Sequence, residues 1–103
     1  MLLLGIDIGT SSVKVSVVNA DTQQIITSAQ FPDQESPIKA IHPGWAEQSP
    51  LMWWEQTQQA LARCHAKGGY NPHDIAAIGI AYQMHGLVLV DKDQNVLLNS
   101  INW

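Results

Sequence analysis

The chain of 103 residues has a single cysteine, Cys64, and only five lysine and arginine residues. One cysteine cannot close an internal disulfide, and it provides no cysteine cluster for a zinc site. The formal net charge of −4 and the lack of a basic run argue against nucleic-acid binding. No apolar run reaches the length of a membrane span, and Leu2–Leu4 is too short and lacks the positive flank of a signal peptide. We therefore expect a cytoplasmic protein whose partners include neither nucleic acid nor a membrane.

Charged residues are also scarce, at 14%, whereas hydrophobic residues make up 46% of the chain. This composition is typical of a globular domain and excludes a disordered chain. A length of 103 residues fits one small domain or a piece of a larger one. Because the sequence ends on Ser100–Trp103 and has no polar tail, we expect a piece of a longer protein.

Two common nucleotide-binding motifs are missing, the G-x-x-x-x-G-K-[ST] loop and the G-x-G-x-x-G loop. The N-terminal stretch has a different pattern. Leu2–Ile8 is apolar except for Asp7, which predicts a strand that is buried on both faces and ends near a carboxylate. Gly9–Ser12 consists of turn residues, and valine then alternates with polar residues in Val13–Val17, as in a half-exposed strand. The pattern predicts a β-hairpin.

The tip of this hairpin carries groups that could bind phosphate and magnesium. Backbone N–H groups gathered in a turn bind anions, and the three hydroxyls of Gly9–Ser12 and the Lys14 ammonium can add to them. Asp7 offers the hard oxygen ligand that Mg²⁺ accepts while it keeps several waters. The hairpin alone is equally compatible with an ordinary turn in which Asp7 caps a neighbouring loop.

The middle of the chain predicts a third strand and a helix. Gln24–Gln30 follows a turn at Asn19–Thr22 and is expected to pair antiparallel with the second strand. Phe31–Gln48 contains several prolines and is expected to be an irregular crossing segment. Ser49–Pro50 predicts the start of a helix, and Gly68–Gly69 predicts its end. The residues expected on its packed face are Trp53, Thr57, Ala60, Leu61 and Cys64, and those expected to point away are Gln56, Gln58, Gln59 and Arg63.

The last third of the chain predicts further strands. Ile75–Tyr82 is expected to be another buried strand, parallel to Leu2–Ile8 because a helix lies between them in sequence. The expected fold class is therefore α/β, a mixed β-sheet with a crossover helix. A terminal hairpin is also expected, with strands at Gly86–Val90 and Val96–Leu98 around a turn at Asp91–Asn95.

A polar segment, Gln83–Gly86, follows Ile75–Tyr82 and is expected at the same sheet edge as Asp7. Gln83 and His85 could hydrogen-bond a polyol while Met84 packs on its carbon face. The alternative is a turn in which His85 bonds a backbone group, which is the commoner role of a lone histidine.

The other side chains that could carry chemistry are expected to be structural. Cys64, on the packed helix face, is expected to act as a small hydrophobic residue. Three tryptophans are expected to pack in the core or at interfaces, namely Trp45, Trp53 and Trp54. Three histidines lack the spacing of a metal site and are expected on the surface or in loops, namely His42, His65 and His73.

Gly5–Lys14, with the sequence GIDIGTSSVK, resembles the N-terminal phosphate motif of the FGGY carbohydrate kinases. This motif is shared by many actin-like ATPases. Gln83–Gly86, with the sequence QMHG, is similar to the motif of the xylulokinases within this family, whereas gluconate kinases commonly carry serine in place of Gly86. Other stretches that resemble the family in the same order are Pro43–Gln48, Trp53–Trp54, Ile78–Ile80 and Ile101–Trp103.

The resemblance implies the ribonuclease H-like (actin-like ATPase) fold, with ATP and Mg²⁺ as cofactors. It implies that Asp7 holds or orients the magnesium ion through water. The residues implied to bind the ATP phosphates are Gly9, Thr10, Ser11, Ser12 and Lys14. The residues implied to bind the sugar are Gln83, Met84, His85, Gly86 and Trp103.

We expect from this resemblance an ATP-dependent sugar kinase that converts a ketopentose, D-xylulose, into D-xylulose 5-phosphate. Residues 1–103 are expected to form part of its N-terminal domain and to be inactive alone. The catalytic aspartate is expected farther along the polypeptide. The expected partners are a small sugar and ATP, with a homodimer as a possibility for the longer protein. The alternatives are a kinase for another sugar or sugar acid, such as gluconate or ribulose, and a non-catalytic actin-like nucleotide-binding module.

Overall fold

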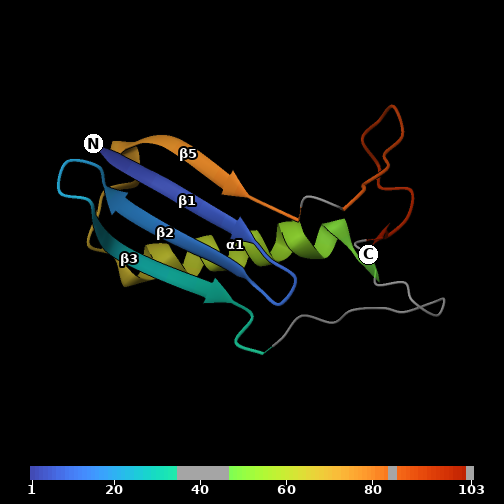
Figure 1. Ribbon diagram of the computed structural model, residues 1–103, viewed down its shortest axis with the longest axis horizontal. Helices are drawn as coiled ribbons and strands as arrows, with labels where there is room; N and C mark the ends of the chain where they lie inside the picture. The colour runs from blue at the N-terminus through green and yellow to red at the C-terminus, as the bar shows by residue number, and fades with distance from the viewer. Residues whose placement is uncertain (35–46, 84–85, 102–103) are drawn as a thin grey trace.

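The computed structural model describes residues 1–34, 47–83 and 86–101. Figure 1 shows their arrangement as a sheet backed by one long helix. The elements in chain order are β1 (Leu2–Ile8), β2 (Val13–Asn19), β3 (Gln24–Phe31), β4 (Glu47–Gln48), α1 (Pro50–Lys67), the 3₁₀ helix η1 (Pro72–Asp74), β5 (Ile75–Ala81) and β6 (Ser100–Ile101).

The main sheet has four strands in the order β3-β2-β1-β5. The β1–β2 and β2–β3 pairs are antiparallel, and β5 is parallel to β1. The helix α1 lies between β3 and β5 in the chain. The chain therefore crosses from β3, at one edge of the sheet, to β5, at the other edge next to β1. The predicted mixed sheet with a crossover helix is confirmed.

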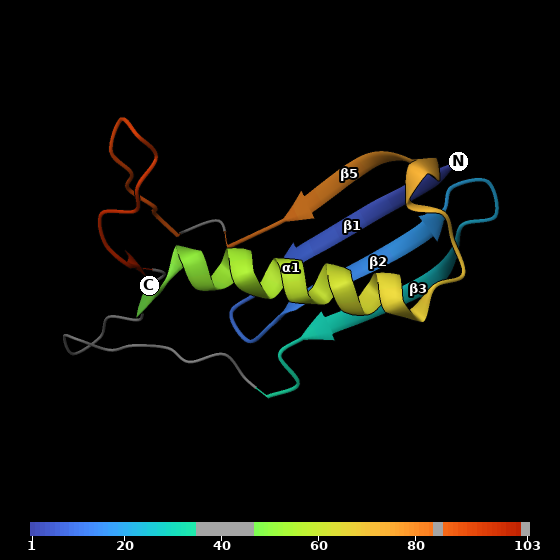
Figure 2. The same cartoon turned by 180° about the vertical axis from the view of Figure 1, so that it is seen from behind.

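The core lies between one face of this sheet and α1. In Figure 2 the helix crosses in front of β1, β2 and β3 and leaves β5 beyond its edge. The valines at alternate positions of β2 point toward the helix, so Val15 is fully buried. Cys64 of α1 is buried in the same core, as expected for a small hydrophobic residue. Burying one such valine stabilises the fold by about 1.5–3 kcal/mol. The buried core residues are Leu4, Ile6, Val13, Val15, Val17, Ala29, Ala60 and Cys64.

Both predicted ends of α1 are confirmed. The Ser49 hydroxyl accepts a hydrogen bond from the Met52 backbone N–H at 3.4 Å, and Pro50 occupies the first turn. At the other end Gly68 has a φ of 68°, and its N–H donates to the His65 carbonyl at 3.0 Å. Most side chains would be strained at this φ, so glycine ends the helix there.

The expectation that Gln56 points away from the sheet is wrong. Its side chain is buried, together with Thr57. Gln56 precedes Ala60 by four residues, and Ala60 precedes Cys64 by four, so the three residues share one stripe of the helix. Spacing, and not polarity, decides which side chain of α1 is buried.

The expectation that β1 and β5 are buried on both faces is also wrong. In β1 only the helix-facing side is buried, and Gly5 and Asp7 on the other side are exposed. In β5 every residue after the partly buried Ile75 is exposed, with Ile78 at 59% and Ile80 at 57%. The reason is that α1, the only helix over the sheet in the described ranges, lies across β1–β3. Trp54 is likewise exposed and outside the core, and Trp45 lies outside the described residues.

The terminal hairpin forms only near its turn, where its outermost bond runs from the Leu97 N–H to the Leu89 carbonyl at 3.0 Å. The Asp91 N–H donates to the Asn95 carbonyl at 3.0 Å, and one isolated bridge joins Val90 to Val96. The predicted strands on either side do not form, because the apolar side chains there, Leu87 among them, remain exposed and have no sheet face to pack on. The sequence also failed to indicate a short antiparallel pair between β4 and β6.

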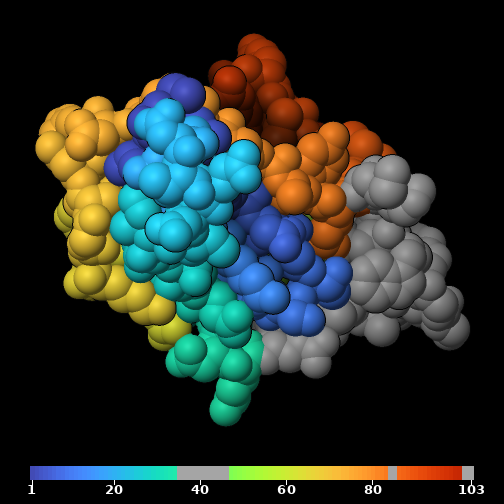
Figure 3. Space-filling model, turned by 60° about the vertical axis from the view of Figure 1, so that its left-hand side comes forward, coloured from blue at the N-terminus to red at the C-terminus, as the bar shows by residue number. Residues whose placement is uncertain are grey.

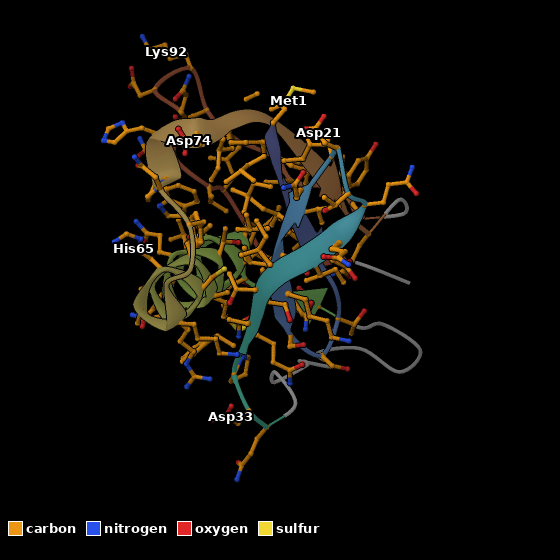
Figure 4. All side chains as sticks on the ribbon, turned by 90° about the vertical axis from the view of Figure 1, so that its left-hand side faces the viewer. Met1, Asp21, Asp33, His65, Asp74 and Lys92 are labelled. Carbon is orange, nitrogen blue, oxygen red and sulfur yellow. The ribbon has the colours of Figure 1, made fainter. Side chains whose placement is uncertain are left out.

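The predicted turn after β2 is confirmed. The Asn19 side-chain oxygen accepts hydrogen bonds from the N–H groups of Asp21 and Thr22 at 2.9 Å and 3.3 Å. The Asp21 carboxylate pairs with the Met1 amino group at 2.9 Å, as the labelled side chains in Figure 4 illustrate. Figure 4 also shows His65 on the outer side of α1, which agrees with the surface position expected for it. No helix in the described ranges is long and apolar enough to cross a membrane.

Candidate functional site

The turn at the tip of the β1–β2 hairpin is tight. The Gly9 N–H donates to the Ser12 carbonyl at 3.0 Å and closes the turn. A Cβ atom at position 9 would lie 3.1 Å from the same carbonyl oxygen, so a larger residue would force the turn to shift. The hydroxyl-bearing residues Thr10 and Ser11 lie at the tip of the turn, between Gly9 and Ser12, and Ser11 is exposed.

Asp7 and Lys14 face each other across the β1–β2 ladder, and both are exposed. They lie on the face of the sheet away from α1, since strand residues alternate and Ile6 faces the core. In Figure 3 the blue atoms of β1 and β2 lie at the surface between the teal atoms of β3 and the orange atoms of β5. A depression of about 510 Å³ is lined by Gly5, Ile6, Asp7, Lys14, Ser16, Gly79, Ile80 and Ala81.

The floor of this depression has no side chains at two paired positions. Gly5 and Gly79 are register partners in the parallel β1–β5 pair. A Cβ atom at Gly79 would meet no heavy atom within 4 Å, so the space in front of it is open. The strands therefore leave room beside Asp7 and Lys14.

Asp7 is the carboxylate in this depression that could bind a divalent cation. Among the described residues no group of three or more His, Cys, Asp or Glu side chains could hold a metal ion. A cation at Asp7 would then take most of its oxygens from water or a ligand, and Mg²⁺ is the ion that keeps several waters in such sites. The donor set fits hydrated magnesium and does not fit a dedicated protein cage.

The segment after β5 meets the hairpin turn. The Gln83 side-chain Nε2 donates to the Gly9 carbonyl at 3.4 Å and to the side-chain Oε1 of Gln48 at 3.2 Å. The Gly86 N–H donates to the Gln83 carbonyl at 3.0 Å. Gln83 is thus brought to the turn at Gly9, as expected for the carboxyl ends of neighbouring parallel strands. Met84, His85 and Trp103, which were also predicted to bind the sugar, lie outside the described residues.

Sequence reasoning missed two buried polar residues next to this turn, Glu47 and Gln48 of β4. Gln48 is 1% exposed, and its Nε2 donates to the Thr10 carbonyl at 2.8 Å. Glu47 is 6% exposed, and its Oε2 has no hydrogen-bond partner within the described part of the chain. Both were assigned to the irregular crossing segment, because no local pattern indicates that the segment returns to the hairpin. The one available signal was that Pro43–Gln48 resembles a family motif.

Tyr70 and Cys64 lie away from this turn and do not take part in the site. Burial, with a smaller contribution from neighbouring Cys64, raises the pKa of the Tyr70 hydroxyl above its ordinary value. A tyrosine hydroxyl with a raised pKa stays neutral at neutral pH, and the fully buried Cys64 side chain does not contact solvent.

Comparison with known proteins identifies the family. Residues 2–103 match the FGGY family of carbohydrate kinases, N-terminal domain. The chain belongs to the FGGY family of carbohydrate kinases. It is 37% identical over 102 residues to a xylulose kinase of Escherichia coli (strain K12), covering 99% of this chain and 20% of that relative. It is 39% identical over 102 residues to a xylulose kinase of Bacillus subtilis (strain 168), covering 98% of this chain and 19% of that relative.

Solved structures of FGGY kinases share the fold. The crystal structure of a xyloylose kinase from Brucella ovis superposes with a TM-score of 0.88 at 33% identity. The match covers 98% of this chain and 20% of that protein. The fold is therefore the N-terminal part of the actin-like ATPase fold of these kinases. The chain spans about a fifth of the length of the Escherichia coli and Bacillus subtilis relatives.

Proposed function

We propose that this chain is the N-terminal part of an ATP-dependent sugar kinase that transfers the γ-phosphoryl group to D-xylulose. One observation carries the proposal: Gln83, at the start of the QMHG segment, hydrogen-bonds the Gly9 carbonyl of the hairpin turn. A phosphoryl-transfer site needs the acceptor and the ATP phosphates next to each other. Family membership and the names of the relatives support the same activity.

On the nucleotide side, the turn Gly9–Ser12 would bind the phosphates through its N–H groups and hydroxyls, with Lys14 adding positive charge. Asp7 would hold or orient hydrated Mg²⁺, which supplies neutralisation of phosphate charge when it is bound. Phosphoryl transfer depends on positioning and on charge neutralisation, and the hairpin offers groups for both.

On the acceptor side, the segment Gln83–Gly86 and Trp103 would bind the sugar. The side-chain oxygen of Gln83 could accept a hydrogen bond from the sugar, because this buried Oε1 has no hydrogen-bond partner within the described ranges. The aspartate that would take the proton from the accepting hydroxyl belongs to a later part of the proposed polypeptide.

An apolar groove supports the proposal that residues 1–103 are part of a larger domain. The groove has a volume of about 330 Å³ and lies between α1 and the β1–β5 edge. Trp54 and Ile80 on its rim are more than half exposed, which is unusual for large apolar side chains grouped together. We propose that a later segment of the same polypeptide covers it. Its lining residues are Ile6, Ile8, Pro50, Trp53, Trp54, Thr57 and Ile80.

The test of the proposed activity is a sugar panel with the full-length protein. ADP formation is measured with D-xylulose, D-ribulose, gluconate and glycerol, each against a reaction without sugar. We expect the highest kcat/KM with D-xylulose. A higher value with gluconate or ribulose would favour the alternative kinase, and ATP binding without turnover on any sugar would favour a non-catalytic nucleotide-binding module.

A further inference from the structure

Gln48 joins three segments of the chain through its side-chain amide. Its Nε2 donates to the Thr10 carbonyl in the hairpin turn at 2.8 Å. Its Oε1 accepts from the indole N–H of Trp53 in α1 at 3.0 Å and from Nε2 of Gln83 after β5 at 3.2 Å. The residue is 1% exposed, so water does not compete for these bonds.

The chemistry of the partners fixes the orientation of both glutamine amides. An indole N–H can only donate and a backbone carbonyl can only accept, so Oε1 of Gln48 must face Trp53 and its Nε2 must face Thr10. Because Oε1 of Gln48 accepts, the atom of Gln83 that reaches it must be the amide nitrogen. A 180° flip of either amide would place like groups against each other.

Together the two glutamines hold successive carbonyls of the hairpin turn. Gln83 donates to the Gly9 carbonyl and Gln48 donates to the Thr10 carbonyl. A trans peptide unit is planar, and its N–H points opposite to its C=O. Fixing these two carbonyls therefore directs the N–H groups of Thr10 and Ser11 away from the two glutamines, as an anion-binding turn requires.

We infer that Gln48 is a positioning residue that fixes the phosphate-binding turn and Gln83 relative to each other. This inference rests on the proposed function, in which the turn binds ATP and Gln83 belongs to the sugar-binding segment. Gln48 acts through Thr10 on the nucleotide side and through Gln83 on the sugar side. The indole of Trp53 orients the amide that makes both contacts.

Two substitutions at Gln48 separate its two contacts in the full-length kinase. Gln48→Met removes the contacts with Thr10 and Gln83 and also the contact with the Trp53 indole, so kcat/KM should fall about tenfold to a hundredfold for ATP and for sugar alike. Gln48→Glu keeps oxygens for Trp53 and Gln83 but puts an oxygen against the Thr10 carbonyl. It should raise the KM for ATP about tenfold and change the KM for sugar much less.

A matched control tests whether the replacement of glutamine by methionine has this effect by itself. Gln58→Met makes the same replacement at an exposed position of α1 and should leave both KM values unchanged. If both Gln48 variants keep wild-type KM values and kcat, or lower activity only in proportion to lost folded protein, the positioning role is wrong.

Amide hydrogen exchange tests the same role without any activity. In the substrate-free wild-type protein the side-chain amide protons of Gln48 should exchange at least about tenfold more slowly than those of exposed Gln58. Backbone exchange in the turn Gly9–Ser12 should become about tenfold faster in Gln48→Met than in Gln58→Met. Fast exchange of the Gln48 amide in the wild type would overturn the inference even if the variants fail to fold. A wild-type enzyme that is inactive on every sugar but has a protected Gln48 amide would instead overturn the proposed function.

Discussion

Two neighbouring strands of the sheet differ sharply in what covers them. Ile6 of β1 and Ile80 of β5 are register partners on the same face, yet Ile6 is 9% exposed and Ile80 is 57% exposed. Their side chains are identical, and α1 accounts for the difference because it lies over β1–β3 and stops short of β5. The covered part has a closed core, whereas the β5 edge presents an exposed apolar surface.

The largest expected effect contrasts a charge in the covered part with the same charge at the edge. Val15→Asp would bury an unpaired carboxylate beneath α1, which costs several kcal/mol, and should abolish cooperative unfolding. Ile80→Asp should change the free energy of unfolding of the 103-residue chain by about 1 kcal/mol or less, because its side chain already meets water. Thermal unfolding followed by circular dichroism measures both.

The longer protein sharpens this contrast. If a later segment covers the groove, Ile80→Asp in the full-length protein should destabilise it by several kcal/mol, as at a core position. If Ile80→Asp changes the free energy of unfolding equally little in the 103-residue chain and in the full-length protein, the groove is not covered.

A smaller effect distinguishes two glycines. Gly9→Ala brings a Cβ to 3.1 Å from the Ser12 carbonyl and should destabilise the hairpin by about 1–3 kcal/mol. Gly79→Ala at the open edge adds a Cβ with no heavy atom within 4 Å and should stay within about 0.5 kcal/mol of the wild type. Denaturant unfolding at constant m-value measures the difference. Similar values for the two variants would contradict the tight turn.

The smallest expected effect concerns the exposed turn beyond β5. Two hydrogen bonds from Asn95 lower the pKa of the Asp91 carboxyl. The larger effect comes from the Asn95 backbone N–H at 2.9 Å, and the smaller one from its side-chain amide at 3.1 Å. A lowered pKa means that this carboxylate stabilises the turn above its unfolded pKa of about 3.9, and that the contribution is lost as pH falls through the folded value. An NMR titration should give Asp91 a midpoint below about 3.9. A midpoint at or above that value would show that the turn bonds do not persist in solution.

Sequence patterns predicted the parts of the fold that depend on local order. Alternating valines in Val13–Val17 gave the half-buried strand, and Ser49–Pro50 gave the helix start, because a strand period or a cap involves only neighbouring residues. The exposure of Ile80 was missed because it depends on where a helix from another segment lies. Gln48 was missed for the same reason: its partners at Thr10 and Gln83 are 38 and 35 residues away.

The central claim is that the β1–β2 hairpin serves the nucleotide and the metal, and not the sugar. Asp7→Asn in the full-length protein tests it most directly, with kcat measured at saturating sugar and sugar affinity measured by calorimetry. We predict that kcat falls about a hundredfold or more while the Kd for D-xylulose stays within about threefold. Asp21→Asn, the same change at the opposite end of β2, is the matched control and should leave kcat unaltered. Wild-type turnover of Asp7→Asn across a magnesium titration would contradict the account.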